Sequence, residues 1–101
     1  MNRKISIQKD KLVEFCMKHR IQRLAIYGSA LRSDFGRGSD IDLLVEFEPG
    51  HTPGFFKLFE MEEELSSLFG GYKVDLRTPQ DLSLYFRDKV IQGAEVQYVQ
   101  G

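Results

Sequence analysis

The chain has 101 residues, of which 42% are hydrophobic and 29% are charged, and its net charge is −1. This length and composition predict one soluble globular domain over residues 1–101. Because the chain has no excess of positive charge, we expect no direct binding to nucleic acid. No apolar run reaches ~18 residues, and no secretory signal is expected, so we predict no membrane association. The single cysteine, Cys16, excludes an internal disulfide and a thiolate metal cage and suits the cytoplasm.

The charges are unevenly distributed along the chain. Residues 1–39 hold nine Lys and Arg against three Asp and Glu, whereas residues 40–101 hold five against twelve. This asymmetry has two interpretations. Either the protein has two solvated faces of opposite sign, or a basic wall faces an acidic one and holds a phosphate-rich ligand with metal ions.

The first part of the chain predicts a helix, a strand and a turn. A helix is expected over residues 6–19, because Leu12, Phe15, Cys16 and His19 follow helical spacing on one face. The apolar run 23–28 ends in glycine and predicts a buried strand. Residues 29–34 then predict a short helical turn, with Ser29 as its cap, and residues 35–39 predict a loop.

The remainder alternates between strands and helices. Strand 40–48 is the clearest element, since apolar and polar residues alternate with a period of two. A helix over 55–69, a strand over 72–78, a helix over 82–93 and a strand over 95–99 follow. We expect the stripe of helix 55–69 that faces the core to contain Phe55, Leu58, Phe59, Leu65 and Phe69. The predicted fold is α/β (α+β): a small mixed β-sheet with helices mainly on one face, which leaves the other face free for chemistry.

Three aspartates carry the strongest functional signal. Asp40 and Asp42 are two residues apart on a strand, so both carboxylates project from one face, ~6.5–7 Å apart at the backbone. Two such like charges repel unless a cation neutralises them, and Mg²⁺ favours carboxylates together with phosphate oxygens. Asp75 has the same alternation on another strand. If the two strands are neighbours, three carboxylates converge and fit a pair of metal ions ~3.5–4 Å apart.

A second signal lies twelve residues before Asp40. At Gly28 and Ser29 a strand turns into a helix, where free N–H groups and a flexible glycine favour binding of an anion. Ser29 can donate to a phosphate oxygen, and Arg32 is one turn away. We therefore expect Gly28, Ser29 and Arg32 to bind a nucleotide's phosphates.

These residues resemble a known signature. Gly28-Ser29, ten residues and then Asp40-Ile41-Asp42 are similar to the Gly-Ser…Asp-x-Asp motif of nucleotidyltransferases related to DNA polymerase beta. The small size, the run over residues 39–45 and the later Asp75 resemble the minimal nucleotidyltransferase (MNT) branch. The cradle keeps the family's arginine position at Arg32 but has Leu31 where a small alanine is usual.

The resemblance implies a function. The family transfers a nucleoside monophosphate from a triphosphate such as ATP with two Mg²⁺ ions. By analogy Asp40, Asp42 and Asp75 hold the metals, Asp75 also helps to orient or deprotonate the acceptor hydroxyl, and Gly28 and Ser29 hold the triphosphate. MNT proteins pair with HEPN-domain ribonuclease toxins and silence them as antitoxins by adenylylating a tyrosine. The domain is too small to enclose a nucleotide alone, which favours a partner protein that completes the cleft.

Other interpretations remain open at this stage. The chain could neutralise a toxin by contact alone, it could adenylylate a small molecule (although this usually needs an extra helical domain), or the motif could be accidental. The strand carboxylates could simply be solvated, with Asp75 paired to Lys73 or Arg77, and Ser29 could be only a helix cap.

Overall fold

The computed structural model describes residues 6–32, 35–36 and 38–101. Helices and strands alternate along the chain, as the sequence predicts. In chain order the elements are α1 (Lys9–Lys18), β1 (Ile21–Tyr27), the 3₁₀ helix η1 (Gly28–Leu31), β2 (Ile41–Phe47), α2 (Phe55–Leu68), β3 (Val74–Arg77), the 3₁₀ helix η2 (Pro79–Asp81), α3 (Leu84–Gly93) and β4 (Glu95–Val99).

The four strands form one mixed sheet in the order β3-β2-β1-β4. Strand β1 is antiparallel to both β2 and β4, whereas β2 and β3 are parallel. Parallel neighbours require a crossover connection, and α2 supplies it. The predicted small mixed sheet is therefore confirmed, and β3 forms one of its edges.

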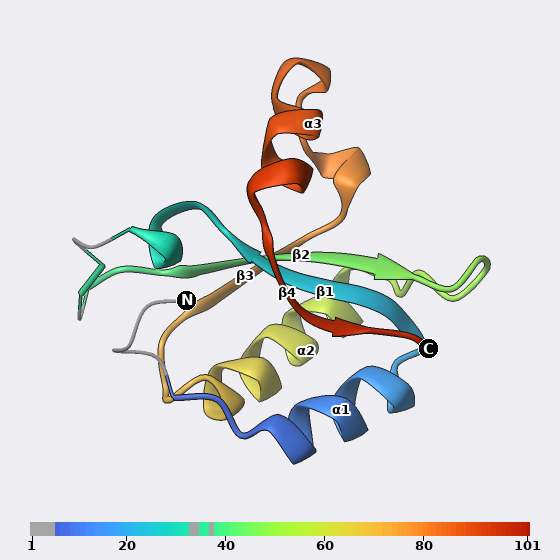
Figure 1. Ribbon diagram of the computed structural model, residues 1–101. Helices are drawn as coiled ribbons and strands as arrows, with labels where there is room; N and C mark the ends of the chain where they lie inside the picture. Colours follow the sequence, from blue (N-terminus) through green and yellow to red (C-terminus); the bar gives the residue numbers. More distant parts are fainter. Residues whose placement is uncertain (1–5, 33–34, 37) are drawn as a thin grey trace.

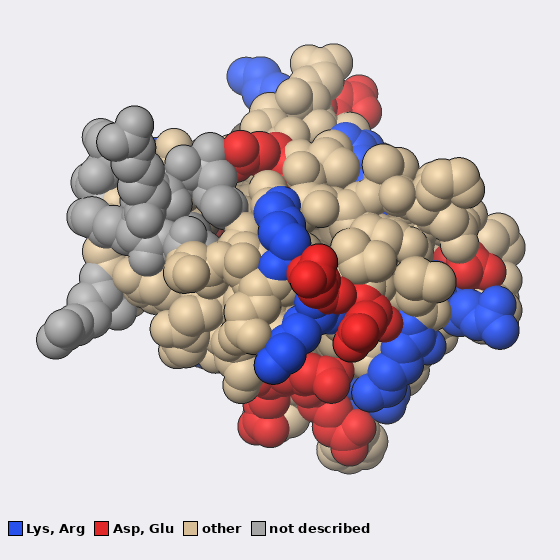
Figure 2. All heavy atoms as spheres, turned by 60° about the horizontal axis from the view of Figure 1, so that its bottom comes forward, with Lys and Arg blue, Asp and Glu red and all other residues tan. Residues whose placement is uncertain are grey.

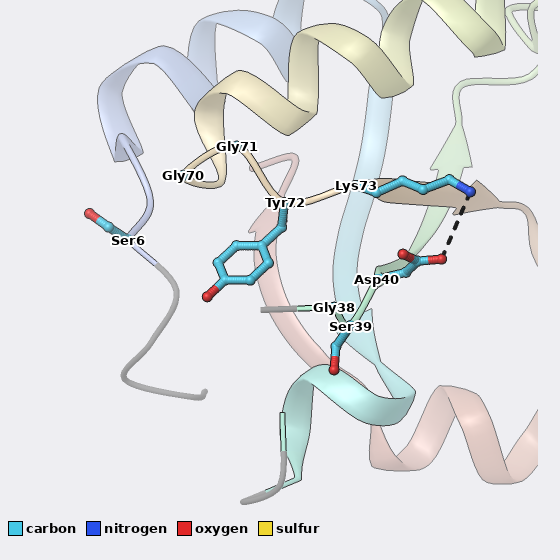
Figure 3. A pocket seen from close by; sticks show the side chains of 8 residues that line it. All are labelled: Ser6, Gly38, Ser39, Asp40, Gly70, Gly71, Tyr72 and Lys73. Atoms are coloured by element: carbon cyan, nitrogen blue, oxygen red, sulfur yellow. Dashed lines mark ion pairs between the residues drawn. The ribbon is translucent and has the colours of Figure 1, made fainter. Parts of the chain in front are cut away.

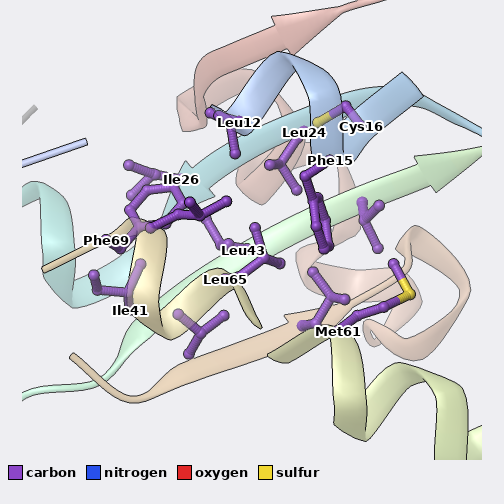
Figure 4. Packing of buried hydrophobic residues seen from close by; sticks show 14 of the residues in the cluster. Leu12, Phe15, Cys16, Leu24, Ile26, Ile41, Leu43, Met61, Leu65 and Phe69 are labelled. Atoms are coloured by element: carbon purple, nitrogen blue, oxygen red, sulfur yellow. The ribbon is translucent and has the colours of Figure 1, made fainter. Parts of the chain in front are cut away.

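Helices α1 and α2 pack side by side against one face of the sheet, while α3 stands on the opposite side (Figure 1). The apolar residues of β1 and β2 meet the two helices in a single core (Figure 4). Leu12 and Phe15 of α1 are buried there, as is Cys16, and burial raises the pKa of its thiol to about 12. Each fully buried aliphatic or aromatic side chain contributes roughly 1.5–3 kcal/mol, so this layer holds the sheet in place.

The predicted apolar stripe of α2 is partly wrong. Phe55 and Phe59 are 84% and 59% exposed, whereas Met61, which the prediction omitted, is buried. The buried residues of this segment are Met61, Leu65, Leu68 and Phe69. With 3.6 residues per turn, they occupy one arc of the helix, and Phe55 and Phe59 lie on its flank.

The opposite face of the sheet is not wholly open. Ala25 and Leu44 are paired across β1 and β2, and both are buried although they alternate with the core residues. The 3₁₀ helix η2 contacts β2 on the side where α3 stands (Figure 1). The free part of this face therefore lies toward the beginning of β2, where the aspartates are.

The uneven charge distribution does not produce two walls on the face formed by α1 and α2, because basic and acidic side chains are interleaved there (Figure 2). Ion pairs join the two parts of the chain: Lys18 with Glu64, Arg20 with Glu48 and Arg23 with Glu46. This pattern favours the solvated interpretation. In the described part of the chain, no helix is both long and apolar enough to cross a bilayer.

Candidate active site

Strand register brings two of the predicted carboxylates together. Asp42 of β2 and Asp75 of β3 are direct partners in the parallel pair, and neighbouring strands lie ~4.8 Å apart. Their neighbours in sequence, such as Leu43 and Leu76, are buried in the core, so both aspartates project from the opposite face. Asp40 precedes β2 by one residue and belongs to the same face by alternation.

The site carries a local excess of negative charge. Burial raises the pKa of Asp42, and the carboxylates of Asp75 and Asp40 raise it further, while Arg77 acts in the opposite direction. Asp42 therefore lies where a cation would stabilise its charged form most effectively.

Two cations, Arg77 at the end of β3 and Lys73 just before its start, partly offset this charge. Arg77 Nη2 lies 3.8 Å from Asp75 Oδ2, and Lys73 Nζ lies 4.0 Å from Asp40 Oδ2 (Figure 3). Asp75 thus pairs with Arg77, one of the two cations considered as its partner if the strand carboxylates are simply solvated. Both contacts are exposed, and exposed ion pairs are worth only about 0–1 kcal/mol. A metal cation could therefore replace Lys73 or Arg77 as the partner of its aspartate at a small cost in free energy.

The donor set fits a hard divalent cation. Within residues 6–32, 35–36 and 38–101, no three His, Cys, Asp or Glu side chains converge as a metal-binding group. Asp40 is paired with Lys73, and Asp75 with Arg77. The convergence of three carboxylates expected from the sequence is therefore not present. The adjacent Asp42 and Asp75 still provide the carboxylate oxygens that Mg²⁺ takes together with phosphate oxygens.

Gly28 lies directly against Asp42. Its φ of +74° is in the left-handed region, and a Cβ at this position would be 2.8 Å from Asp42 Oδ2. Glycine is thus required both by the backbone conformation and by the close approach. The predicted phosphate cradle and the central carboxylate form one unit.

The turn after Gly28 differs from the prediction. It is a 3₁₀ helix of four residues rather than a helical turn over 29–34, and residues 33 and 34 lie outside the described part of the chain. A turn this short contributes little helix dipole. The Ser29 hydroxyl donates to the carbonyl of Asp40 at 3.2 Å, which ties the cradle to the start of β2, and no side-chain cap is formed. Arg32 is exposed and caps the end of the turn.

Sequence reasoning did not include Tyr27 in the site. Tyr27 is the register partner of Asp42 on β1, and its pKa is raised by burial first and by Asp42 second. Its position immediately before Gly28 was the available signal. Arg77 was considered only as a surface partner of Asp75, and its alternation with Asp75 placed it on the same face.

A pocket of about 530 Å³ opens beside Asp40. The side chains of Ser39, Tyr72 and Lys73 surround it, together with the glycines at 70 and 71 (Figure 3). This volume lies within the range typical of small-ligand sites. Asp40 connects it to the candidate site, whereas Asp42 and Asp75 do not line it.

Residues 9–96 match the nucleotidyltransferase domain family. The chain belongs to this family. It is 34% identical over 79 residues to the protein adenylyltransferase MntA of Thermococcus cleftensis, a match that covers 78% of this chain and 75% of that protein. A protein named "putative protein adenylyltransferase" from Methanocaldococcus jannaschii is 48% identical over 59 residues, and there the match spans 58% of this chain and just over half, 57%, of the relative.

Solved structures of minimal nucleotidyltransferases share the fold. A protein described as a "putative minimal nucleotidyltransferase" has a TM-score of 0.69 at 29% identity, with 86% of each chain covered. A toxin–antitoxin structure with AMP-PNP has a TM-score of 0.72 at 20% identity over 93% of this chain and 75% of that one. The complex of a tri-AMPylated Shewanella oneidensis HEPN toxin with its MNT antitoxin has a TM-score of 0.63 at 19% identity, with 91% and 70% covered. The family assignment from the sequence is confirmed, and the chain is a nucleotidyltransferase of the minimal type.

Proposed function

We propose that this nucleotidyltransferase transfers AMP from ATP to a tyrosine hydroxyl of a HEPN toxin and thereby acts as its antitoxin. The observation that carries the proposal is the register of Asp42 with Asp75, with Gly28 held against Asp42. The names of its relatives support the choice of acceptor: MntA of Thermococcus cleftensis is a protein adenylyltransferase, and the Shewanella oneidensis toxin is AMPylated in complex with its MNT antitoxin.

The chain's own residues take distinct roles in this proposal. Asp40, Asp42 and Asp75 would hold two Mg²⁺ ions, with Asp40 and Asp75 exchanging their ion pairs with Lys73 and Arg77 for the metals. The ions, when bound, would neutralise the phosphates and polarise the α-phosphorus. Gly28, Ser29 and Arg32 would hold the triphosphate. The Ser29 hydroxyl, which donates to the Asp40 carbonyl, is already beside the metal ligands.

The transfer itself is a substitution at phosphorus. The tyrosine oxygen forms a bond to the α-phosphorus, and the bond from the α-phosphorus to the oxygen bridging to the β-phosphate breaks, so pyrophosphate leaves with that electron pair. The Asp75 carboxylate orients the hydroxyl and accepts its proton. This role suits Asp75 because β3 is at the edge of the sheet, where an acceptor can approach.

The decisive experiment incubates the chain, its HEPN partner, Mg²⁺ and radiolabelled ATP, and then measures the intact mass of both proteins. The expected result is one or more AMP groups on the partner and loss of its ribonuclease activity. Asp42→Asn should abolish the transfer. Glu46→Gln should not, because Glu46 is on the same strand but pairs with Arg23.

The same assay separates the alternatives. If Asp42→Asn still neutralises the toxin without labelling it, the chain acts by contact alone. If the label moves to a free small molecule and the partner has no effect on the rate, the acceptor is not a protein.

We place the reaction in the cytoplasm, away from membranes and without direct nucleic-acid binding. The buried, unpaired thiol of Cys16 is compatible with that compartment.

A further inference from the structure

A groove runs along the seam between α2 and the edge strand β3. It has a volume of about 450 Å³, and we call it the α2–β3 groove. Its lining residues that matter here are Phe55, Leu58, Phe59, Glu62, Asp75 and Arg77. A second hollow of about 390 Å³ continues it toward Lys73 and shares Phe59 and Glu62 with it. Phe59 therefore lies at the centre of a depression that follows β3 along its length.

The two phenylalanines of the groove face water. Phe55 and Phe59 are 84% and 59% exposed, although both lie beside the buried arc of α2. Large aromatic side chains grouped in a hollow are characteristic of protein contact surfaces. Their exposure is not required by the fold, because Met61 and Leu65 already fill the layer between α2 and the sheet.

The groove is continuous with the candidate active site, because Asp75 lines both. The strand order β3-β2-β1 places Gly28 at one side of Asp42 and Asp75 at the other. The phosphates and the acceptor thus approach from different sides. The acceptor side is the β3 edge, which opens into the α2–β3 groove.

We propose that the α2–β3 groove binds the segment of the partner protein that carries the acceptor hydroxyl. This inference rests on the proposed function and assigns the surface that recognises its substrate. The segment inserts apolar side chains between Phe55 and Phe59 and brings its hydroxyl to Asp75. Phe55 and Phe59 act as docking residues and take no part in the chemistry.

The charge and hydrogen bonding of the groove define this occupant. Glu62, Asp75 and Asp81 line it against one cation, Arg77, which is 3.8 Å from Asp75. A segment with basic residues beside its apolar ones complements this surface, whereas nucleic acid would be repelled. The Leu76 N–H donates to Glu62 Oε2 at 2.7 Å, so that part of the edge is already satisfied. The partner therefore binds through side chains rather than by adding a strand.

The chain offers closely matched controls. Phe56 and Phe86 are 86% and 62% exposed, nearly the same as Phe55 and Phe59, but neither lines the groove. The test compares the double variant Phe55→Ser/Phe59→Ser with the control Phe56→Ser/Phe86→Ser. All four positions are helical, and Phe and Ser have similar helix propensity. Equal thermal midpoints would establish that folding is unaffected.

Two measurements are made with the HEPN partner of this chain. The first is the Kd for the partner without nucleotide, and the second is steady-state AMP transfer with the partner and ATP varied separately. The groove variant should bind the partner at least about tenfold more weakly and raise the KM for the partner by a similar factor. The KM for ATP should be unchanged, and the control variant should match the wild type in every value.

The outcomes separate this inference from the proposed function. If the wild type transfers AMP and the groove variant behaves like the control, the groove is refuted while the function stands. If both double variants lose affinity equally, the α2–β3 groove is not the specific site and the inference also fails. If the wild type transfers nothing, the proposed function fails, and the Kd comparison alone decides: selective weakening supports the groove, and equal binding or none refutes it.

Discussion

Gly28→Ala tests the link between the cradle and the central carboxylate. At a φ of +74°, a residue with a Cβ costs about 1–2 kcal/mol. The added methyl would lie 2.8 Å from Asp42 Oδ2, so the Asp42 side chain must leave its preferred rotamer at about 0.5–1.5 kcal/mol. The expected loss of stability is about 1.5–3.5 kcal/mol, which lowers the Tm by at least about 6 °C.

Two comparisons separate these contributions. Gly50 has a φ of +81°, and a Cβ there would have no heavy atom within 4 Å, so Gly50→Ala should show only the backbone cost. In an Asp42→Ala background the methyl at residue 28 meets only the Cβ of residue 42 at 3.8 Å, an ordinary contact. A double-mutant cycle measured by urea unfolding should therefore give a coupling of about 0.5–1.5 kcal/mol.

Activity gives the second readout. Gly28→Ala should lose AMP transfer, because it displaces the Asp42 carboxylate, whereas Gly50→Ala should retain transfer at a temperature where both are folded. If Gly28→Ala costs no more than Gly50→Ala and shows no coupling to residue 42, the close approach is wrong. If it folds and transfers AMP at the wild-type rate, the position of Asp42 does not govern the chemistry.

Three further predictions concern stability. Asp42→Asn should raise the Tm of the ligand-free protein by about 1–8 °C, because it removes a like charge opposite Asp75; a lower Tm in calorimetry would contradict this. Burial lowers the pKa of His19 from 6.5, so the unfolded chain takes up the proton before the folded one. The free energy of unfolding therefore falls as the pH drops through 6.5. His19→Gln should flatten this pH dependence in urea titrations at pH 5.5–7.5, roughly one unit either side of the pKa of an unperturbed histidine. Phe69→Ala should cost about 3–5 kcal/mol by denaturant unfolding, whereas Phe55→Ala should cost less than about 0.5 kcal/mol, since Phe69 is fully buried and Phe55 is exposed.

The sequence predicted the order of elements because the periodicity of helices and the periodicity of strands are both clear in it. Strand β2 differs from its prediction by only one residue at each end, since its apolar and polar residues alternate except at Leu44. Helix α2 begins at the predicted residue and ends one residue early, before the glycine pair that stops it. The bounds of these two elements depend on residues that are close together in the sequence, so a local pattern is enough to predict them.

The register of β2 with β3 could not be read from the sequence. It depends on long-range contacts such as the hydrogen bond from the Ile41 N–H to the Lys73 carbonyl at 2.8 Å. A shift of one residue would move Asp75 to the other face of the sheet. Alternation placed Asp42 and Asp75 on polar faces, but only the crossover through α2 makes them neighbours. The contact of Gly28 with Asp42 follows from the same assembly.

Apolar residues were misplaced for a different reason. Periodicity gives the axis of an amphipathic face but not its width, which depends on what packs against it. Phe55 and Phe59 lie within a face of ordinary width, yet the sheet covers only the arc of Met61 and Leu65. Leu44 lies on the polar side of β2 and is nevertheless buried, because the opposite face of the sheet is partly covered.

Two departures from the local pattern lie together at the β3 edge, where a function can explain them. A sequence consistent at every level would place its phenylalanines in the core and keep its carboxylates apart, and departures from this rule concentrate at functional sites. Here Asp42 is held beside Asp75 at a cost in repulsion, and Phe55 and Phe59 are left in water in the groove that Asp75 lines. Both departures meet at the β3 edge. A cation would relieve the first and a partner segment the second, so the same edge of the sheet accounts for the chemistry and for the choice of acceptor.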